Sequence, residues 1–254
     1  MTINDSLDLL LAEIDLLKAE LQLHAHEITP ALQKNLDIDY THDSNALEGS
    51  SLNLAETDMV IRNGLMLPGK PMGENLTALN HYQTIHFIRD QAREQNLLSA
   101  SLLQKLHIML SRGVQHQIGG AFRSQEGRLI GGQTAPPPEQ IAHLLETHLH
   151  WLNLEGPFLH PVVFAAEAHF RLLSLLPFQN YNGLCARLLM NLVLLSEGFP
   201  VLNIVANRVV WSDYTASFNA AQTGEPQAWQ AFIAKQAVLN AQNLLHRLEH
   251  QATI

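Results

Sequence analysis

The chain has 254 residues and a formal net charge of −9, and 46% of its residues are apolar, which is ample for the core of one globular domain. Only 15 residues are lysine or arginine and no basic aromatic patch occurs, so we expect no nucleic-acid partner. The single cysteine, Cys185, excludes a disulfide within the chain.

The first predicted element is an amphipathic helix over residues 6–24. Its apolar positions follow i, i+3, i+4, i+7 spacing and are Leu7, Leu10, Leu11, Ile14, Leu17 and Leu21. Acidic residues lie between the leucines, unlike a signal peptide, and no apolar run reaches the ~20 residues that span a bilayer. We therefore expect a cytoplasmic protein without a membrane partner. We expect this helix to dock on the core or on another copy, which leaves a homo-oligomer open.

Short connections separate the next predicted helices. These cover residues 30–40, a short segment from Ser44, and residues 55–63, 74–94 and 102–110. The sequence Pro68-Gly69-Lys70-Pro71 marks the clearest turn, just before the fourth of them. Residues 119–138, which contain Gly119-Gly120 and a proline run, are the only segment with predicted strand structure.

Five further helices are predicted over residues 138–153, 160–175, 183–197, 205–222 and 227–250. No repeat or low-complexity stretch interrupts them. The sequence therefore predicts an all-α fold with a small β-hairpin. We divide it into an N-terminal helical extension over residues 1–34 and one domain over residues 35–254.

Residues 176–187 read LPFQNYNGLCAR and lead into an apolar helix pattern. This segment resembles the signature of the Fic family, H-P-F-x-(D/E)-G-N-G-R-x-x-R. The matching positions are Pro177, Phe178, Asn182, Gly183 and Arg187. The departures are Leu176 where the family has its catalytic histidine, Asn180 at the metal-binding acid, Tyr181 at a glycine and Leu184 at the first arginine. A plainer alternative is a buried helix whose asparagines form a turn and a cap.

The resemblance implies a reaction whose needs can be compared with these residues. Fic proteins typically transfer AMP from ATP to a protein hydroxyl, which requires a base, a cation and donors that hold the phosphates. Leu176 cannot accept a proton, so we assign no catalytic residue. Asn180 brings no negative charge, so we assign no metal ligand and expect weak Mg²⁺ binding. Tyr181 disfavours a positive φ at the turn that would wrap a phosphate. The positions left to bind a nucleotide or phosphate are Asn182, Gly183 and Arg187.

Residues 44–49 read SNALEG and fit the Fic inhibitory pattern (S/T)-x-x-x-E-(G/N). The resemblance implies that Glu48 pairs with Arg187 and blocks the γ-phosphate position. The predicted inhibitory residues are Ser44, Glu48 and Gly49. Taken alone, a serine followed within one turn by an acid is also an ordinary helix start.

The region 119–138 resembles the Fic flap, a β-hairpin whose edge can align a target peptide by strand addition. We expect residues 121–131 to contact an unknown target or partner protein. Glycines and prolines of this kind also mark any surface loop. Further matches, at His160-Pro161, Ala166–His169, Arg208 and Tyr214, extend the resemblance over about residues 35–235.

Other reactive side chains have plainer interpretations. His169 lies two turns before Leu176, about 10 Å along the helix axis, so we expect a packed histidine and no substitute base. Cys185 has no base beside it and reads as a small core residue. His246 and His250 have the spacing of a metal pair, but without a third ligand we expect an exposed helix tail.

Three functions follow from the resemblance. The leading one is a pseudoenzyme, a degenerate relative of the ATP-dependent protein adenylyltransferases that binds ATP, another nucleotide or a target segment but transfers AMP poorly or not at all. The second is an active nucleotidyltransferase with a non-standard site that Glu48 inhibits. The third is a purely structural or regulatory interaction module.

Overall fold

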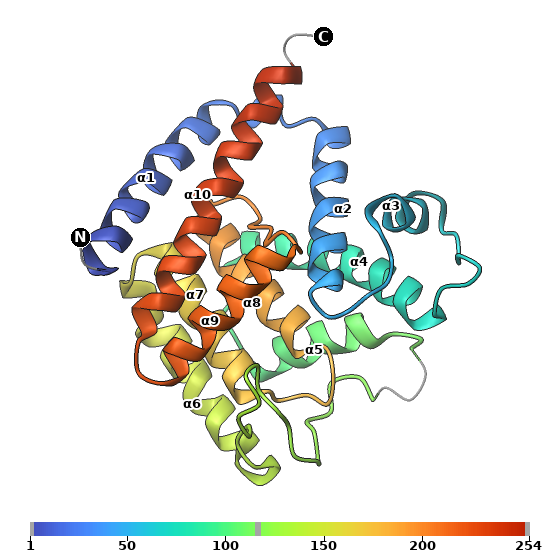
Figure 1. The fold of residues 1–254 in the computed structure, drawn as a ribbon, viewed down its shortest axis with the longest axis vertical. Coiled ribbons are helices and arrows are strands. Elements are labelled where there is room, and N and C mark those ends of the chain that lie inside the picture. Colours follow the sequence, from blue (N-terminus) through green and yellow to red (C-terminus); the bar gives the residue numbers. More distant parts are fainter. Residues whose placement is uncertain (1–2, 115–117, 252–254) are drawn as a thin grey trace.

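The computed structural model describes residues 3–114 and 118–251, and within them the chain is built of helices (Figure 1). The α-helices are α1 Ile3–Leu23, α2 Pro30–Ala46, α3 Leu54–Asn63, α4 Met72–Glu94, α5 Ala100–Ser111, α6 Ile141–Leu154, α7 Pro161–Leu175, α8 Asn182–Ser196, α9 Arg208–Gln222 and α10 Pro226–Gln251. Single 3-10 turns cover Ala25–Glu27, Pro138–Gln140 and Gly156–Phe158. In the described ranges, none of the helices combines the length and the hydropathy that a membrane crossing needs.

Helix α8 runs through the centre of the molecule, and α2, α4, α5 and α7 pack around it. Every residue from Asn182 to Leu194 is buried, which explains why its sequence is apolar on all sides. Its few polar residues have to find partners inside the protein: Asn191 bonds to the backbone of Leu202, while Asn182 and Arg187 belong to the site described below.

Helix α1 lies along α10 (Figure 1). Leu7, Ile14 and Leu21, spaced seven residues apart, are buried in the main core. At the surface Lys18 Nζ donates to the carbonyl of Glu197 over 2.6 Å. The sequence left open whether this helix docks on the core or on another copy of the chain. In the structure, α1 packs on the core.

The predicted β-hairpin is wrong in one respect, because residues 119–138 contain no β-strand. Two isolated β-bridges form, Phe122 with Phe178 and Arg128 with Thr134, and a few further backbone hydrogen bonds close the loop, such as that from Ala135 N–H to the Gly127 carbonyl over 3.0 Å. The loop turns tightly at Gly131 and Gly132, which both have positive φ, and Pro136-Pro137-Pro138 has no N–H groups to continue a ladder.

Hydrogen bonds from a buried arginine, and not strand pairing in a sheet, hold this loop in place. The Nε of Arg123 donates to the carbonyl of Leu176 over 2.7 Å, and its Nη1 donates to the carbonyl of Gln125 over 2.9 Å. One side chain thus connects the loop to the end of α7.

The separate short helix predicted from Ser44 is also wrong. The helix that begins with a Thr29 cap and Pro30 continues to Ala46, so Ser44 lies in its last turn. Glu48 and Gly49 follow in a turn, with Gly49 at φ +90°. No glycine or proline stands between Tyr40 and Ser44 to end the helix earlier.

Candidate functional site

The connection between α7 and α8 is a rigid turn. Helix α7 ends at Leu175, and Leu176 caps it with a φ of +50°. The side chain of Asn182 then accepts a hydrogen bond from the backbone N–H of Phe178 over 2.9 Å and donates one to its carbonyl over 2.7 Å. Phe178 is fully buried and stacks on His107, with ring centroids 4.2 Å apart. Burial lowers the pKa of His107 to about 4, so this ring is neutral and acts as a packing surface.

Tyr181 precedes α8 with φ +61°, although a side chain there disfavours this conformation. The turn therefore keeps the backbone shape that glycine would adopt, at a cost of about 1–2 kcal/mol. The Tyr181 hydroxyl lies 3.4 Å from the hydroxyl of Thr77 on α4. Contacts of the side chain thus hold the strained residue in place.

A cavity of about 370 Å³ opens beside this turn and gathers residues that are far apart in the sequence. It brings together Glu48, Leu176, Asn180, Asn182, Gly183 and Arg187, all of which the sequence singled out. Its other walls are Leu47, Arg128, Ile130, Leu173, Gln179, Tyr181, Trp211 and Tyr214. Ser44 lies behind Arg187, outside the lining, and Gly49 lines a neighbouring cavity of about 290 Å³.

Arg187 is the most strongly held side chain of the site, with 1% of its surface exposed. Its Nε donates to Ser44 Oγ over 2.8 Å, and its Nη2 donates to the Ser44 carbonyl over 2.9 Å and to Glu48 Oε1 over 2.8 Å. Burial lowers the pKa of Arg187, but the Glu48 carboxylate together with Tyr214 and Tyr40 outweighs that effect, and the pKa lies above its ordinary value. The guanidinium is therefore charged, and these three bonds tie α8 to the end of α2.

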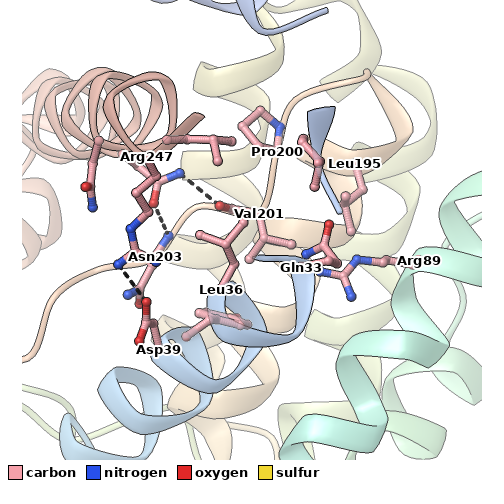
Figure 2. Close-up of a pocket in the computed structure, with 14 residues that line it drawn as sticks. Gln33, Leu36, Asp39, Arg89, Leu195, Pro200, Val201, Asn203 and Arg247 are labelled. Atoms are coloured by element: carbon pink, nitrogen blue, oxygen red, sulfur yellow. Dashed lines mark hydrogen bonds and ion pairs between the residues drawn. The ribbon is translucent and has the colours of Figure 1, made fainter. Parts of the chain in front are cut away.

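Helix α2 is also held along its middle, around a third cavity of about 150 Å³ (Figure 2). There Asp39 pairs with Arg247 of α10 over 2.7 Å, and Leu36 lines the cavity together with Pro200 and Val201. None of the site residues predicted from the sequence lines this cavity. Its contribution to the site is to anchor the helix that positions Ser44 and Glu48.

The carboxylate of Glu48 lies against the first turn of α8. A Cβ atom added to Gly183 would come within 2.0 Å of Glu48 Oε1, so a side chain there would have to displace the carboxylate from its present position. The start of a helix attracts an anion through its free N–H groups and its dipole. Here an anion of the protein itself occupies that position.

The contact between Gly183 and Glu48 predicts that the effect of Gly183→Ala on stability depends on whether Glu48 is present. Gly183→Ala should destabilise the protein by about 1–3 kcal/mol, because the new methyl group overlaps the carboxylate. In a Glu48→Gly background the overlap is gone, and the same change should be neutral or stabilise the helix by up to ~1 kcal/mol. Urea unfolding of the two single variants and the double variant tests this, and an equal cost in both backgrounds would contradict it.

The cavity does not suit Mg²⁺, which prefers carboxylates together with substrate phosphates. Glu48 is the only acid in the lining, and it is paired with Arg187. Across the described ranges no three His, Cys, Asp or Glu side chains are placed to hold a metal ion. This includes the tail of α10, where His250 Nδ1 lies 2.9 Å from the carbonyl of His246.

His169 is packed in the core, as the sequence predicted. Its Nε2 lies 3.2 Å from the Tyr214 hydroxyl, its ring is 5.0 Å from that of Trp229, and burial holds its pKa well below the ordinary value. Cys185 is also fully buried, and burial raises the pKa of its thiol, so it is no nucleophile.

Trp211 lines the cavity but was not among the site residues predicted from the sequence. Trp211, on α9, stacks on Tyr214 with ring centroids 5.4 Å apart, and 39% of its surface is exposed. A large aromatic side chain exposed on an amphipathic helix was the available signal. Whether Trp211 faces the cavity depends on how α9 lies against residues 128–130, and only the tertiary structure shows this.

Comparisons with known proteins identify the family of this chain. The model of the Fic/DOC family matches residues 97–194. The protein adenylyltransferase Fic of Drosophila mojavensis is 30% identical over 213 residues, which are 82% of this chain and 42% of that protein. The protein adenylyltransferase fic-1 of Caenorhabditis elegans is 27% identical over 216 residues, which are 81% of this chain and 41% of that protein. This chain thus spans less than half the length of these relatives.

Solved structures show the same fold. A C. elegans Fic-1 structure of residues 134–508 superposes with a TM-score of 0.84 at 23% identity, covering 95% of this chain and 72% of the other. A Fic family protein from Desulfovibrio desulfuricans G20 gives a TM-score of 0.79 at 24% identity, covering 97% and 76%. The domain match, the sequence relatives and the shared fold together establish that this chain belongs to the Fic/DOC family.

Proposed function

We propose that this protein is a Fic-family pseudoenzyme, which uses the cavity to bind a small molecule or a target segment and transfers AMP poorly or not at all. One observation carries the proposal. Among the residues that line the cavity, Glu48 is the only carboxylate and histidine does not occur, while Leu176 stands at the histidine position of the signature. Because Glu48 is paired with Arg187, the lining offers no free base.

The rate enhancement that is lost without a general base supports this proposal. General-base catalysis commonly contributes ~100- to 10,000-fold to a rate. Fic chemistry also needs a cation to balance phosphate charge, and the lining does not suit Mg²⁺. This chain therefore shares the scaffold of relatives named as adenylyltransferases, while its own cavity lining lacks groups that the reaction needs.

Two other functions remain as alternatives. The intact contact of Ser44, Glu48 and Arg187 favours an active nucleotidyltransferase that Glu48 inhibits. An interaction module would work through residues 121–131, where Ala121 and Arg128 are exposed and the loop forms no β-strand of its own that would already be paired.

An AMP-transfer assay distinguishes the pseudoenzyme from the inhibited enzyme. The purified protein, incubated with an ATP analogue that carries a reporter on its AMP moiety, should label neither itself nor a cell lysate above a mock sample. Glu48→Gly should not rescue labelling, because a base is missing. Labelling by Glu48→Gly alone would favour the inhibited enzyme, and strong labelling by the unmodified chain would refute the pseudoenzyme. An active Fic relative serves as positive control.

A further inference from the structure

We propose that the outer face of α1 binds a helix of another protein, and that this partner helix carries lysine or arginine on both sides of an apolar stripe. Helix α1 lies at the edge of the molecule, with α10 along one side of it (Figure 1). None of its residues lines the cavity beside α8. The inference therefore goes beyond the proposed function and holds whether or not AMP is transferred.

Two apolar stripes run along α1 on opposite faces. The inner stripe packs in the core and consists of Leu7, Ile14 and Leu21. The outer stripe is exposed and consists of Leu9, Ala12, Leu16, Ala19 and Leu23. Because successive residues of a helix are turned by about 100°, Leu16 points about 160° away from Ile14. Packing on the core therefore leaves the outer stripe uncovered.

The outer stripe has the spacing of a contact between two helices. Its members are separated by three and four residues in turn, which is the a and d pattern of a coiled coil. From Leu9 to Leu23 the stripe is about 21 Å long. Leu9, Leu16 and Leu23 are 56%, 74% and 74% exposed. Single exposed leucines are common, but three in one line form a continuous patch, and such patches mark interaction surfaces.

Negative charge lies along both edges of the outer stripe. Asp8 and Asp15 stand on one edge and Glu13 and Glu20 on the other, and all four are exposed. These are the e and g positions, whose charges select the partner in a coiled coil. Among the described residues, no lysine or arginine is paired with any of the four. Their charge is therefore available to a basic partner.

A second copy of the chain does not complement this surface. Two outer stripes packed together, in either relative direction, would bring acidic edges against acidic edges, which repel each other. The single lysine of α1, Lys18, points away from the stripe and donates to the carbonyl of Glu197 over 2.6 Å. The 15 lysines and arginines of the chain are scattered, with no two adjacent in the sequence. Charge complementarity therefore selects a basic helix from a different protein.

The same charges disfavour a membrane surface. Helices that lie on membranes carry lysine and arginine on their polar face and are attracted to anionic lipids. The polar residues beside the outer stripe are acidic and would be repelled there. A basic amphipathic helix satisfies both the leucines and the acids of α1.

Fluorescence anisotropy with the full chain and two labelled peptides tests the proposal. Both peptides are three heptads long with leucine at a and d, and they carry either lysine or glutamate at every e and g position. The lysine peptide should bind at least about tenfold more tightly than the glutamate peptide. Leu16→Gln should weaken binding of the lysine peptide at least about tenfold, because the central leucine is lost while helix propensity is kept. The matched control is Met72→Gln, which changes another exposed apolar side chain, 65% exposed, at the start of α4.

A charge reversal separates this surface from the general attraction between a basic peptide and a chain of net charge −9. Asp8→Lys combined with Glu20→Lys should reduce the preference for the lysine peptide over the glutamate peptide at least about fivefold. The matched control, Glu126→Lys combined with Glu139→Lys, makes the same change in net charge at two exposed acids outside α1 and should leave most of the preference intact.

Three results would overturn the inference. One is a lysine peptide that does not bind at high micromolar concentration or binds no better than the glutamate peptide. Another is binding of the lysine peptide that neither Leu16→Gln nor Leu23→Gln weakens. The third is a dimer in sedimentation equilibrium that Leu16→Gln converts to a monomer, because a second copy would then cover the stripe. None of these results bears on AMP transfer, so the pseudoenzyme is tested separately.

Discussion

Replacing Arg187 with leucine is expected to lower the free energy of unfolding by about 3–5 kcal/mol, which is the usual cost of removing one member of a buried charged network. The change removes three hydrogen bonds and leaves Ser44 Oγ without its donor in the core. For a protein of this size the melting temperature should fall by about 10 °C. Calorimetric or circular-dichroism melting curves provide the measurement.

A double-mutant cycle measures how much of this loss of stability comes from the interaction between Arg187 and Glu48. Glu48→Gln should cost about 1.5–3 kcal/mol, because it replaces a charge-assisted bond while one third of the Glu48 side chain faces water. The double variant should cost less than the sum of the single variants, by about 0.5–3 kcal/mol. Arg93→Leu is the control, because its pair with Asp90 is mostly exposed at 77% and 66% and should contribute almost nothing. Strictly additive effects would mean that the two side chains do not stabilise each other.

Restoring catalysis should require several changes together. Leu176→His alone returns a base but leaves the metal position without charge and the start of α8 occupied by Glu48, so activity should stay near background. Adding Asn180→Asp, Tyr181→Gly, Leu184→Arg and Glu48→Gly should raise AMP transfer by about 100-fold or more over the single change. The assay is the reporter labelling described above.

The structure indicates which of these changes is difficult. Tyr181→Gly keeps a backbone that already has φ +61°, so the turn should not move. Leu184 is fully buried, so Leu184→Arg brings a charge into the core unless its end reaches the 290 Å³ cavity that Leu184 lines. A variant with all five changes that folds and binds Mg²⁺-ATP yet transfers no AMP would show that the site differs in shape as well as in residue type. High activity of Leu176→His alone would contradict the roles given to the other positions.

The sequence predicted most of the helices within a few residues, because amphipathic spacing, prolines and caps act locally. Helix α3 is an example, with Asn53 and Glu56 forming the capping box and Gly64 ending the helix. The predictions that were wrong concern segments whose conformation depends on contacts with residues far away along the chain. The 119–138 region reads as a hairpin, but Arg123 holds it by reaching the end of α7, 53 residues away.

The candidate site shows the same division. Leu176, Asn180 and Leu184 are visible in the sequence as residues without the required chemistry, since the identity of a side chain decides whether it can accept a proton or carry charge. The pairing of Glu48 with Arg187, 139 residues apart, was an expectation from resemblance until the packing of α2 against α8 brought the two side chains within 2.8 Å. That Glu48 lies on the first turn of α8, and that Trp211 faces the same cavity, depends on how whole helices are placed against each other. Local sequence does not determine such placement, because it arises from the packing of many side chains that are distant along the chain.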